Sequence, residues 1–234
     1  MSRPVRIGVL DSGVNRNHPH VGKIVDGITI TADGALAGYE DTLGHGTAVA
    51  AVIHHLNPEA DLVAVKIFNG KLATSLPVVL RAIDWCLEHD IQVINLSLGT
   101  LNPEHRAAFE DAVVRTKAAG AVIVSALEIN GAAALPGSLA EVIGVIAAER
   151  SDAAEYQVNH RNGKPVYTAP PFPRDIPGVP RERNLNGVSF AVARVAARVA
   201  ADMQAKELQV KEMEVKDWTG APRSPQRTPD FLSS

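Results

Sequence analysis

The chain has 234 residues, of which 46% are hydrophobic, and a formal net charge of −3. This length predicts one sizeable core, and the small negative charge gives no electrostatic basis for binding nucleic acid or an anionic membrane surface. Cys86 is the only cysteine, so no internal disulfide forms. No apolar run reaches the roughly 18–20 residues of a membrane-spanning helix. Because Met1–Arg6 leads directly into an apolar run without a signal-peptide core, we expect a soluble, cytoplasmic protein.

Apolar, β-branched runs alternate with longer stretches of helical spacing up to residue 147. The expected strands are Val5–Leu10, Ala60–Phe68, Val93–Leu98, Ala121–Ala126 and Val142–Ala147. The expected helices are His45–His55, Pro77–His89 and Pro103–Ala119, the last capped by Gly120. Repeated strand–helix–strand units of this size predict an α/β fold, with a doubly wound, mostly parallel sheet and helices on both faces.

The pattern changes in the C-terminal third of the chain. Residues 151–186 are rich in proline, and we interpret them as loop and irregular edge structure. Three segments follow: an Ala- and Val-rich helix over Ser189–Gln204, a charged, more amphipathic stretch over Glu207–Trp218, and a Pro- and Ser-rich tail over Gly220–Ser234. We therefore expect one domain over residues 1–206 and a C-terminal helix and tail over 207–234, with the tail as a candidate contact for a partner protein.

Three short segments carry residues suited to nucleophilic catalysis. They are Asp11-Ser12-Gly13, Gly44-His45-Gly46-Thr47 and Gly187-Val188-Ser189-Phe190-Ala191. A serine hydroxyl is a poor nucleophile at neutral pH unless a histidine takes its proton, and a buried carboxylate holds that imidazole in the right tautomer. The order Asp, His, Ser along the chain is that of the subtilisin-type triad.

The chain resembles the subtilisin-like serine peptidases from about Arg6 to about Gln204. Five segments carry the resemblance, in one order and with compatible separations: Ile7–Val14, Asn17–Pro19, Asp41–Thr47, Val93–Gly99 and Thr168–Pro170. The resemblance implies a subtilisin-like fold and a serine endopeptidase acting on peptides or proteins. The compact chain, without an evident calcium-binding insertion between His55 and Ala60, makes a dedicated intracellular processing enzyme our expectation.

The resemblance also implies roles for individual residues. Ser189 would attack the peptide carbonyl, His45 would move the proton, and Asp11 would orient the imidazolium. The segment of Ser97, Leu98 and Gly99 would present a strand edge to an extended substrate peptide. The pairs His18/His20 and His54/His55 lack a third ligand at a recognisable spacing, so we expect no metal ion and no cofactor.

Each catalytic candidate also has a purely structural interpretation. Asp11 followed by Ser-Gly is compatible with a turn that ends a strand, His45 with a histidine at a helix start, and Ser189 with an N-cap. A nucleotide-binding doubly wound domain is disfavoured, because neither G-x-G-x-x-G nor a P-loop follows the first expected strand.

The chain departs from the family where an asparagine amide should donate to the oxyanion. The family carries an A-A-G-N-like run, whereas Ser125–Gly131 reads S-A-L-E-I-N-G. A direct overlay puts Ile129 at the Asn position, and a shift of one residue puts Asn130 there. We predict that Asn130 is the donor; the alternative is that it forms an Asn-Gly turn. Loss of one such donor costs about 2.7–4 kcal/mol of transition-state stabilisation, so reduced activity is expected if Asn130 does not donate.

The nucleophile segment departs as well. The family usually reads G-T-S-M-A-[T/S]-P, whereas this chain has Val188 before the serine, Phe190 after it, and Ala193 in place of the proline. These changes support an alternative function: a catalytically weak protein of the subtilase fold that binds peptides or a partner.

Overall fold

The computed structural model describes residues 3–148, 156–161, 163–180 and 183–219. Nine strands form one sheet in the order β10-β11-β9-β6-β5-β1-β4-β2-β3, and the hairpin of β7 and β8 lies outside it. The strands are β1 Arg6–Asp11, β2 Ile24–Ile30, β3 Ala35–Leu36, β4 Asp61–Lys66, β5 Val93–Leu96, β6 Val122–Ala126, β7 Glu128–Ile129, β8 Ala132–Ala133, β9 Ile143–Ala147, β10 Gln157–Arg161 and β11 Lys164–Ala169. Within the nine-stranded sheet, the outermost pairings, β10–β11 and β2–β3, are antiparallel and the others are parallel.

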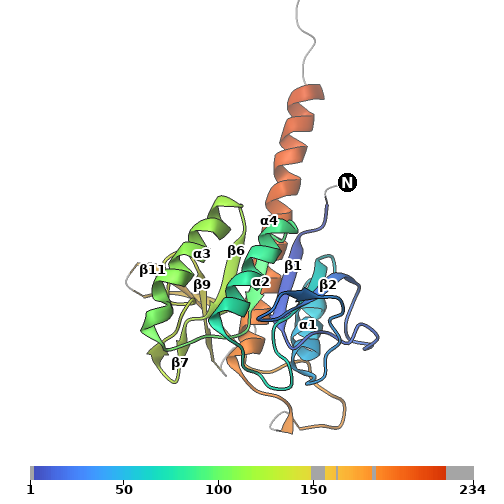
Figure 1. The fold of residues 1–234 in the computed structure, drawn as a ribbon. Helices are drawn as coiled ribbons and strands as arrows, with labels where there is room; N and C mark the ends of the chain where they lie inside the picture. Colours follow the sequence, from blue (N-terminus) through green and yellow to red (C-terminus); the bar gives the residue numbers. More distant parts are fainter. Residues whose placement is uncertain (1–2, 149–155, 162, 181–182, 220–234) are drawn as a thin grey trace, which may run out of the picture.

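The sheet is covered by helices on both faces (Figure 1). They are α1 His45–Leu56, α2 Leu76–Glu88, α3 Arg106–Ala118, preceded by the 3-10 turn Pro103–His105, and α4 Val188–Thr219. Side chains of α1 and α4 share one buried cluster with Ile7 and Val9 of β1, whereas α2 and α3 share the other with Leu10. A strand whose successive side chains enter opposite clusters is buried on both faces, which is why β1 reads as a continuous apolar run. The predicted doubly wound α/β fold is confirmed.

The interpretation of residues 151–186 as irregular was wrong in part, because β10 and β11 form a hairpin at the edge of the sheet. All five residues of β10 are exposed, so its sequence has no apolar alternation to reveal it. Pro165 of β11 lies outside the Tyr167–Ala169 stretch that pairs with β9. The absence of an N–H on this proline therefore removes no hydrogen bond between β11 and β9. Residues 151–155, 162 and 181–182 lie outside the described parts of the chain.

Further elements differ from the sequence prediction, including the short strands β3, β7 and β8, which were not expected. The strand β2 was missed, because Asp26 and Gly27 interrupt its apolar residues and its register shifts between Ile24 and Asp26. Helix α4 runs unbroken from Val188 to Thr219, where two segments were expected, and its C-terminal half extends away from the layers of the fold (Figure 1). The division at residue 206 stays a prediction, and the expected tail over Gly220–Ser234 lies outside the described residues.

Candidate active site

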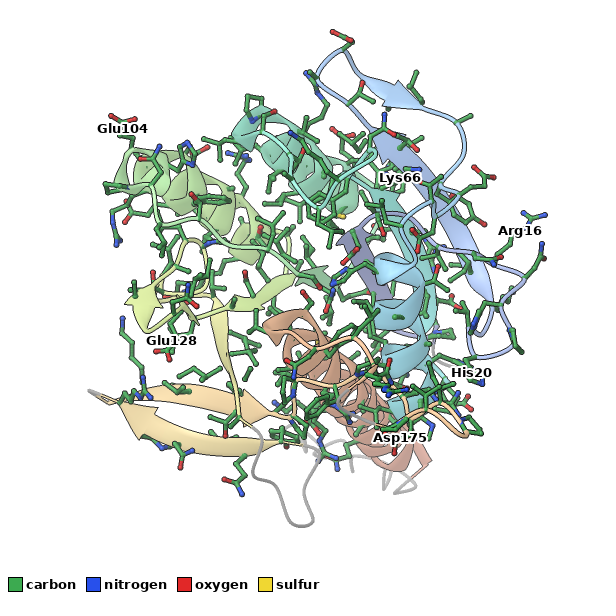
Figure 2. All side chains as sticks on the ribbon, turned by 90° about the horizontal axis from the view of Figure 1, so that it is seen from below. Arg16, His20, Lys66, Glu104, Glu128 and Asp175 are labelled. Atoms are coloured by element: carbon green, nitrogen blue, oxygen red, sulfur yellow. The ribbon has the colours of Figure 1, made fainter. Side chains whose placement is uncertain are left out.

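The candidate residues gather at the carboxyl edge of the central strands, which Figure 2 views from below the orientation of Figure 1. Asp11 is the last residue of β1, and Ser97 follows directly after β5. At the same edge α1 begins at His45 and α4 begins one residue before Ser189. Sites of open α/β sheets form here, because loops after parallel strands and the first turns of the following helices meet at this edge.

Asp11, which is buried, and His45, which is partly buried, form a hydrogen-bonded pair. Nδ1 of His45 lies 2.7 Å from Oδ1 of Asp11, and the side chains are 15% and 0% exposed, respectively. A carboxylate only accepts, so Nδ1 carries the proton and donates it, which leaves Nε2 with its lone pair on the opposite side of the ring. The backbone N–H of Ser12 donates to the same Oδ1 at 2.7 Å. The predicted contact between these two candidates is therefore present.

The pKa of His45 is raised above its ordinary value of 6.5. Burial opposes the charged imidazolium, but the hydrogen bond to Asp11 and the negative charges of Asp11 and Asp41 outweigh it. His45 consequently holds a proton more readily than a free histidine, which suits a group that must take a proton and then release it.

Ser189 is buried at the beginning of α4, where its Oγ donates to the carbonyl oxygen of Ser97 at 3.4 Å. The next residue, Phe190, places its ring centroid 5.6 Å from that of His45. These contacts bring the start of α4 to both His45 and the segment after β5. Sequence reasoning noted Phe190 only as a departure from the family pattern and did not predict its contact with the histidine.

A second carboxylate, Asp41, lies beside the pair. Its Oδ1 accepts hydrogen bonds from the hydroxyl of Ser12 at 2.8 Å and from the N–H groups of Leu43 and Gly44 at 2.9 Å each. Its Oδ2 accepts from the N–H and the hydroxyl of Thr47 at 2.9 and 2.6 Å. Burial alone would raise the pKa of Asp41, but these bonds, those from Thr47 foremost, lower it below its ordinary value of 3.8. From the sequence, Asp41 was included only as the first residue of the segment Asp41–Thr47 and was assigned no role in the site, since the spacing of that segment does not specify these hydrogen-bond partners.

The oxyanion candidate lies in a different setting. Asn130 and Gly131 join β7 to β8 as a two-residue hairpin turn, with φ of 52° and 79°, and both are exposed. Such a turn needs positive φ at both central positions, which Asn-Gly adopts more readily than most pairs. The turn that the sequence offered as the alternative is therefore present, and the oxyanion role of Asn130 stays a prediction.

The proposed substrate segment packs closely against the chain itself. A Cβ added to Gly99 would lie 3.2 Å from Cβ of Ala134 and 3.3 Å from Cδ1 of Ile129. The following residue, Thr100, exchanges two backbone hydrogen bonds of 2.9 Å with Leu135. Little room is left beside Gly99 for a larger side chain, and the substrate-binding role of Ser97, Leu98 and Gly99 stays a prediction.

The described residues also bear on the expectations about metal ions and membrane-spanning segments. Among these residues, no group of three or more His, Cys, Asp or Glu side chains is arranged to hold a metal ion. No helix of the described part of the chain combines the length and apolar character needed to cross a membrane.

Comparisons with known proteins converge on one family. Residues 2–220 match the model of the subtilase family, Peptidase_S8. The chain is 29% identical to subtilisin E of Bacillus subtilis (strain 168) and 28% identical to subtilisin J of Geobacillus stearothermophilus, each over 215 residues covering 84% of this chain. It spans 54% of the length of each of these relatives. A crystal structure of a cold-adapted subtilisin-like serine proteinase shares the fold with a TM-score of 0.66 and 22% identity, covering 86% of this chain and 76% of that one.

Proposed function

Because the chain belongs to the subtilase family, we propose that it is a serine endopeptidase that uses Asp11, His45 and Ser189 as its catalytic triad. The observation that carries this proposal is the partly buried 2.7 Å hydrogen bond between Asp11 and His45, together with the placement of Ser189 at the start of α4. A peptidase needs a base with a defined tautomer and a nucleophile close to that base. The hydrogen bond of Asp11 with His45 supports the first requirement, and the 5.6 Å separation of the Phe190 and His45 rings at the start of α4 supports the second.

The proposed mechanism begins with rotation of the Ser189 hydroxyl. Oγ turns from the carbonyl of Ser97 towards Nε2 of His45, which takes the proton as Oγ attacks the peptide carbonyl. His45 then passes the proton to the leaving amine, while Asp11 stabilises the imidazolium. The backbone N–H of Ser189 at the helix start, with the Asn130 amide as the predicted second donor, would stabilise the oxyanion. In this proposal no cofactor and no metal ion takes part.

Peptides or proteins are the proposed substrates, with the chain acting as a processing enzyme in the cytoplasm. The single cysteine supports a reducing compartment in this proposal. A contact between the C-terminal tail and a partner protein is proposed only from the composition of residues 220–234, which are rich in Pro and Ser.

One observation favours a second candidate function. Asn130 lies at an exposed hairpin turn, and an oxyanion site with one donor instead of two loses about 2.7–4 kcal/mol of transition-state stabilisation. A protein that retained the acid–base pair but lacked this donor would bind peptides and cleave them slowly.

Covalent labelling with a fluorophosphonate tests the proposed function directly. We expect the protein to be labelled at Ser189, and Ser189→Ala to lose both the label and the hydrolysis of a chromogenic peptide while keeping its circular dichroism spectrum. Hydrolysis at the wild-type rate in Ser189→Ala would show that the nucleophile is misassigned. Labelling without measurable turnover would favour the second candidate.

A further inference from the structure

We propose that Asp41 is a positioning residue for His45, holding the first turn of α1 against the end of β1 and placing a second negative charge next to the imidazole. The proposal rests on the catalytic role of His45 proposed above. It concerns a carboxylate outside the proposed triad that accepts hydrogen bonds from Ser12, Leu43, Gly44 and Thr47.

The first support is the way α1 begins. The N–H groups of a helix's first turn have no partner within the helix, and Gly44, the N-cap of α1, has no side chain to offer one. The N–H of Gly46 is instead bonded to Oγ of Ser12 at 2.9 Å, and that of Thr47 to Oδ2 of Asp41. His45 is the residue directly before these two, so its backbone position is set by Ser12 and Asp41.

The second support is that the same bonds attach α1 to β1. Ser12, the residue after Asp11, gives its hydroxyl proton to Asp41 while accepting from Gly46. Thr47 gives its hydroxyl proton to Asp41 and accepts from the N–H of Asn15 at 3.0 Å. Asp41 therefore closes two bridges between the segment that carries the acid and the helix that carries the base. A shift of α1 along β1, which would lengthen the contact of Asp11 with His45, would break several hydrogen bonds at once.

The third support is that the loop bearing Asp41 is itself anchored from β4. Lys66, only 9% exposed, donates from Nζ to the carbonyl oxygen of Glu40 at 2.6 Å. In the parallel pairing of β1 with β4, Lys66 is the direct neighbour of Asp11. Two adjacent strand ends thus hold the loop, and through it the first turn of α1.

The charge of Asp41 adds an electrostatic effect to the mechanical one. The charged and titratable groups near this end of α1 include Asp11 on β1, Glu40 and Asp41 in the preceding loop, and Lys66 on β4, whose ammonium group donates to the backbone carbonyl of Glu40. Arg174, His18 and His20 line the cavity that Asp41, Gly44 and Thr47 also line. A carboxylate at a helix N-terminus is favoured by the helix dipole, and here it also favours the imidazolium, since its charge raises the pKa of His45. In the proposed reaction His45 carries that positive charge in the transition state, so the charge of Asp41 stabilises the transition state.

Matched variants separate these effects from simple helix capping. Asp41→Asn removes the charge while keeping the shape, Thr47→Val removes hydrogen bonds while keeping the charge, and Asp33→Asn makes the same change of net charge in the exposed β2–β3 turn. For Asp41→Asn we expect kcat to fall roughly tenfold or more with little change in KM, because the first turn of α1 loses hydrogen bonds that place His45 and the imidazolium loses a neighbouring negative charge. Thr47→Val should lower kcat less, and Asp33→Asn should leave it unchanged.

The pKa of His45, followed by NMR in the inactive Ser189→Ala background, gives a readout that needs no turnover. Asp41→Asn should lower this pKa and move the acid limb of the kcat/KM profile to lower pH, whereas Thr47→Val should leave the pKa in place. If Asp41→Asn lowers only the melting temperature, with kcat and the His45 pKa unchanged, Asp41 is a helix cap and the proposal is wrong.

Should Asp41→Asn fail to fold, Asp41→Glu is the deciding variant. It keeps the negative charge but changes the position of the carboxylate, so an unaltered kcat would overturn the positioning role. Failure of Ser189 labelling would count against the proposed function and leave the NMR result interpretable.

Discussion

The two sides of the site are held in contrasting ways. Around His45, the side chains of Asp11, Ser12, Asp41 and Thr47 are joined by hydrogen bonds from buried or partly buried atoms. On the other side, the segment after β6 forms an exposed hairpin whose Glu128 is paired with Arg161 at 3.2 Å across to β10. Figure 2 shows Lys66 and Glu128 well separated, Lys66 at the upper right and Glu128 at the left of the view.

The difference indicates which part of the proposed chemistry tolerates change. An acid–base pair requires angles and distances that many buried hydrogen bonds fix together, so one altered residue disturbs all of them. An oxyanion donor is one dipole among several, and its loss slows a reaction without removing the nucleophile. We infer that variation is more readily accommodated on the hairpin side than on the histidine side.

Asp11→Asn should produce the largest effect, on the histidine side. An amide at this position no longer fixes the Nδ1–H tautomer, and in the Ser-His-Asp template this change lowers kcat by about 10⁴. Steady-state kinetics with a chromogenic peptide would measure it, with Asp26→Asn in the exposed part of β2 as the control of equal net charge. A loss below tenfold would indicate that Asp11 does not orient the base.

Asn130→Gly tests the hairpin side and should have the next largest effect. Alanine here would confound two roles, because Asn130 has φ of 52° and a Cβ is strained in that region. Glycine keeps the turn and removes only the amide. If Asn130 donates to the oxyanion, kcat should fall roughly 10²–10³-fold with KM nearly unchanged. An unchanged kcat would leave Asn130 as a turn residue and strengthen the weak-enzyme alternative.

The same contrast separates what the sequence predicted from what it did not. The contact between Asp11 and His45 was predictable, because Asp11 ends an apolar strand and His45 begins a small-residue helix, and the carboxyl edge of a parallel sheet brings such ends together. The five hydrogen bonds of Asp41 were not predictable, since they depend on a loop path that residue spacing does not encode. The hairpin of β10 and β11 was missed because an exposed edge strand needs no apolar pattern. The role of Asn130 stayed ambiguous, because an Asn-Gly pair in a sequence is compatible both with a hairpin turn and with an asparagine that donates to the oxyanion.

Removal of metal ions by a chelator should have the smallest effect. We expect it to destabilise neither the histidine side nor the hairpin side of the site. Calcium takes six to eight oxygen ligands, and the carboxylate of Asp41 is already occupied by N–H and O–H donors on both of its oxygens. The turn from α1 to β4 is short, and its Asn57 donates a buried side-chain hydrogen bond of 3.2 Å to the carbonyl of Ala197 in α4. A cation at either place would have to displace these donors, which would leave the partly buried donors of Ser12 and Thr47 or the buried amide of Asn57 unpaired. We therefore expect EDTA to leave the melting temperature unchanged in calorimetry, with magnesium-saturated EDTA as the control for ionic strength. A fall of several degrees that added calcium reverses would show that an ion stabilises the fold.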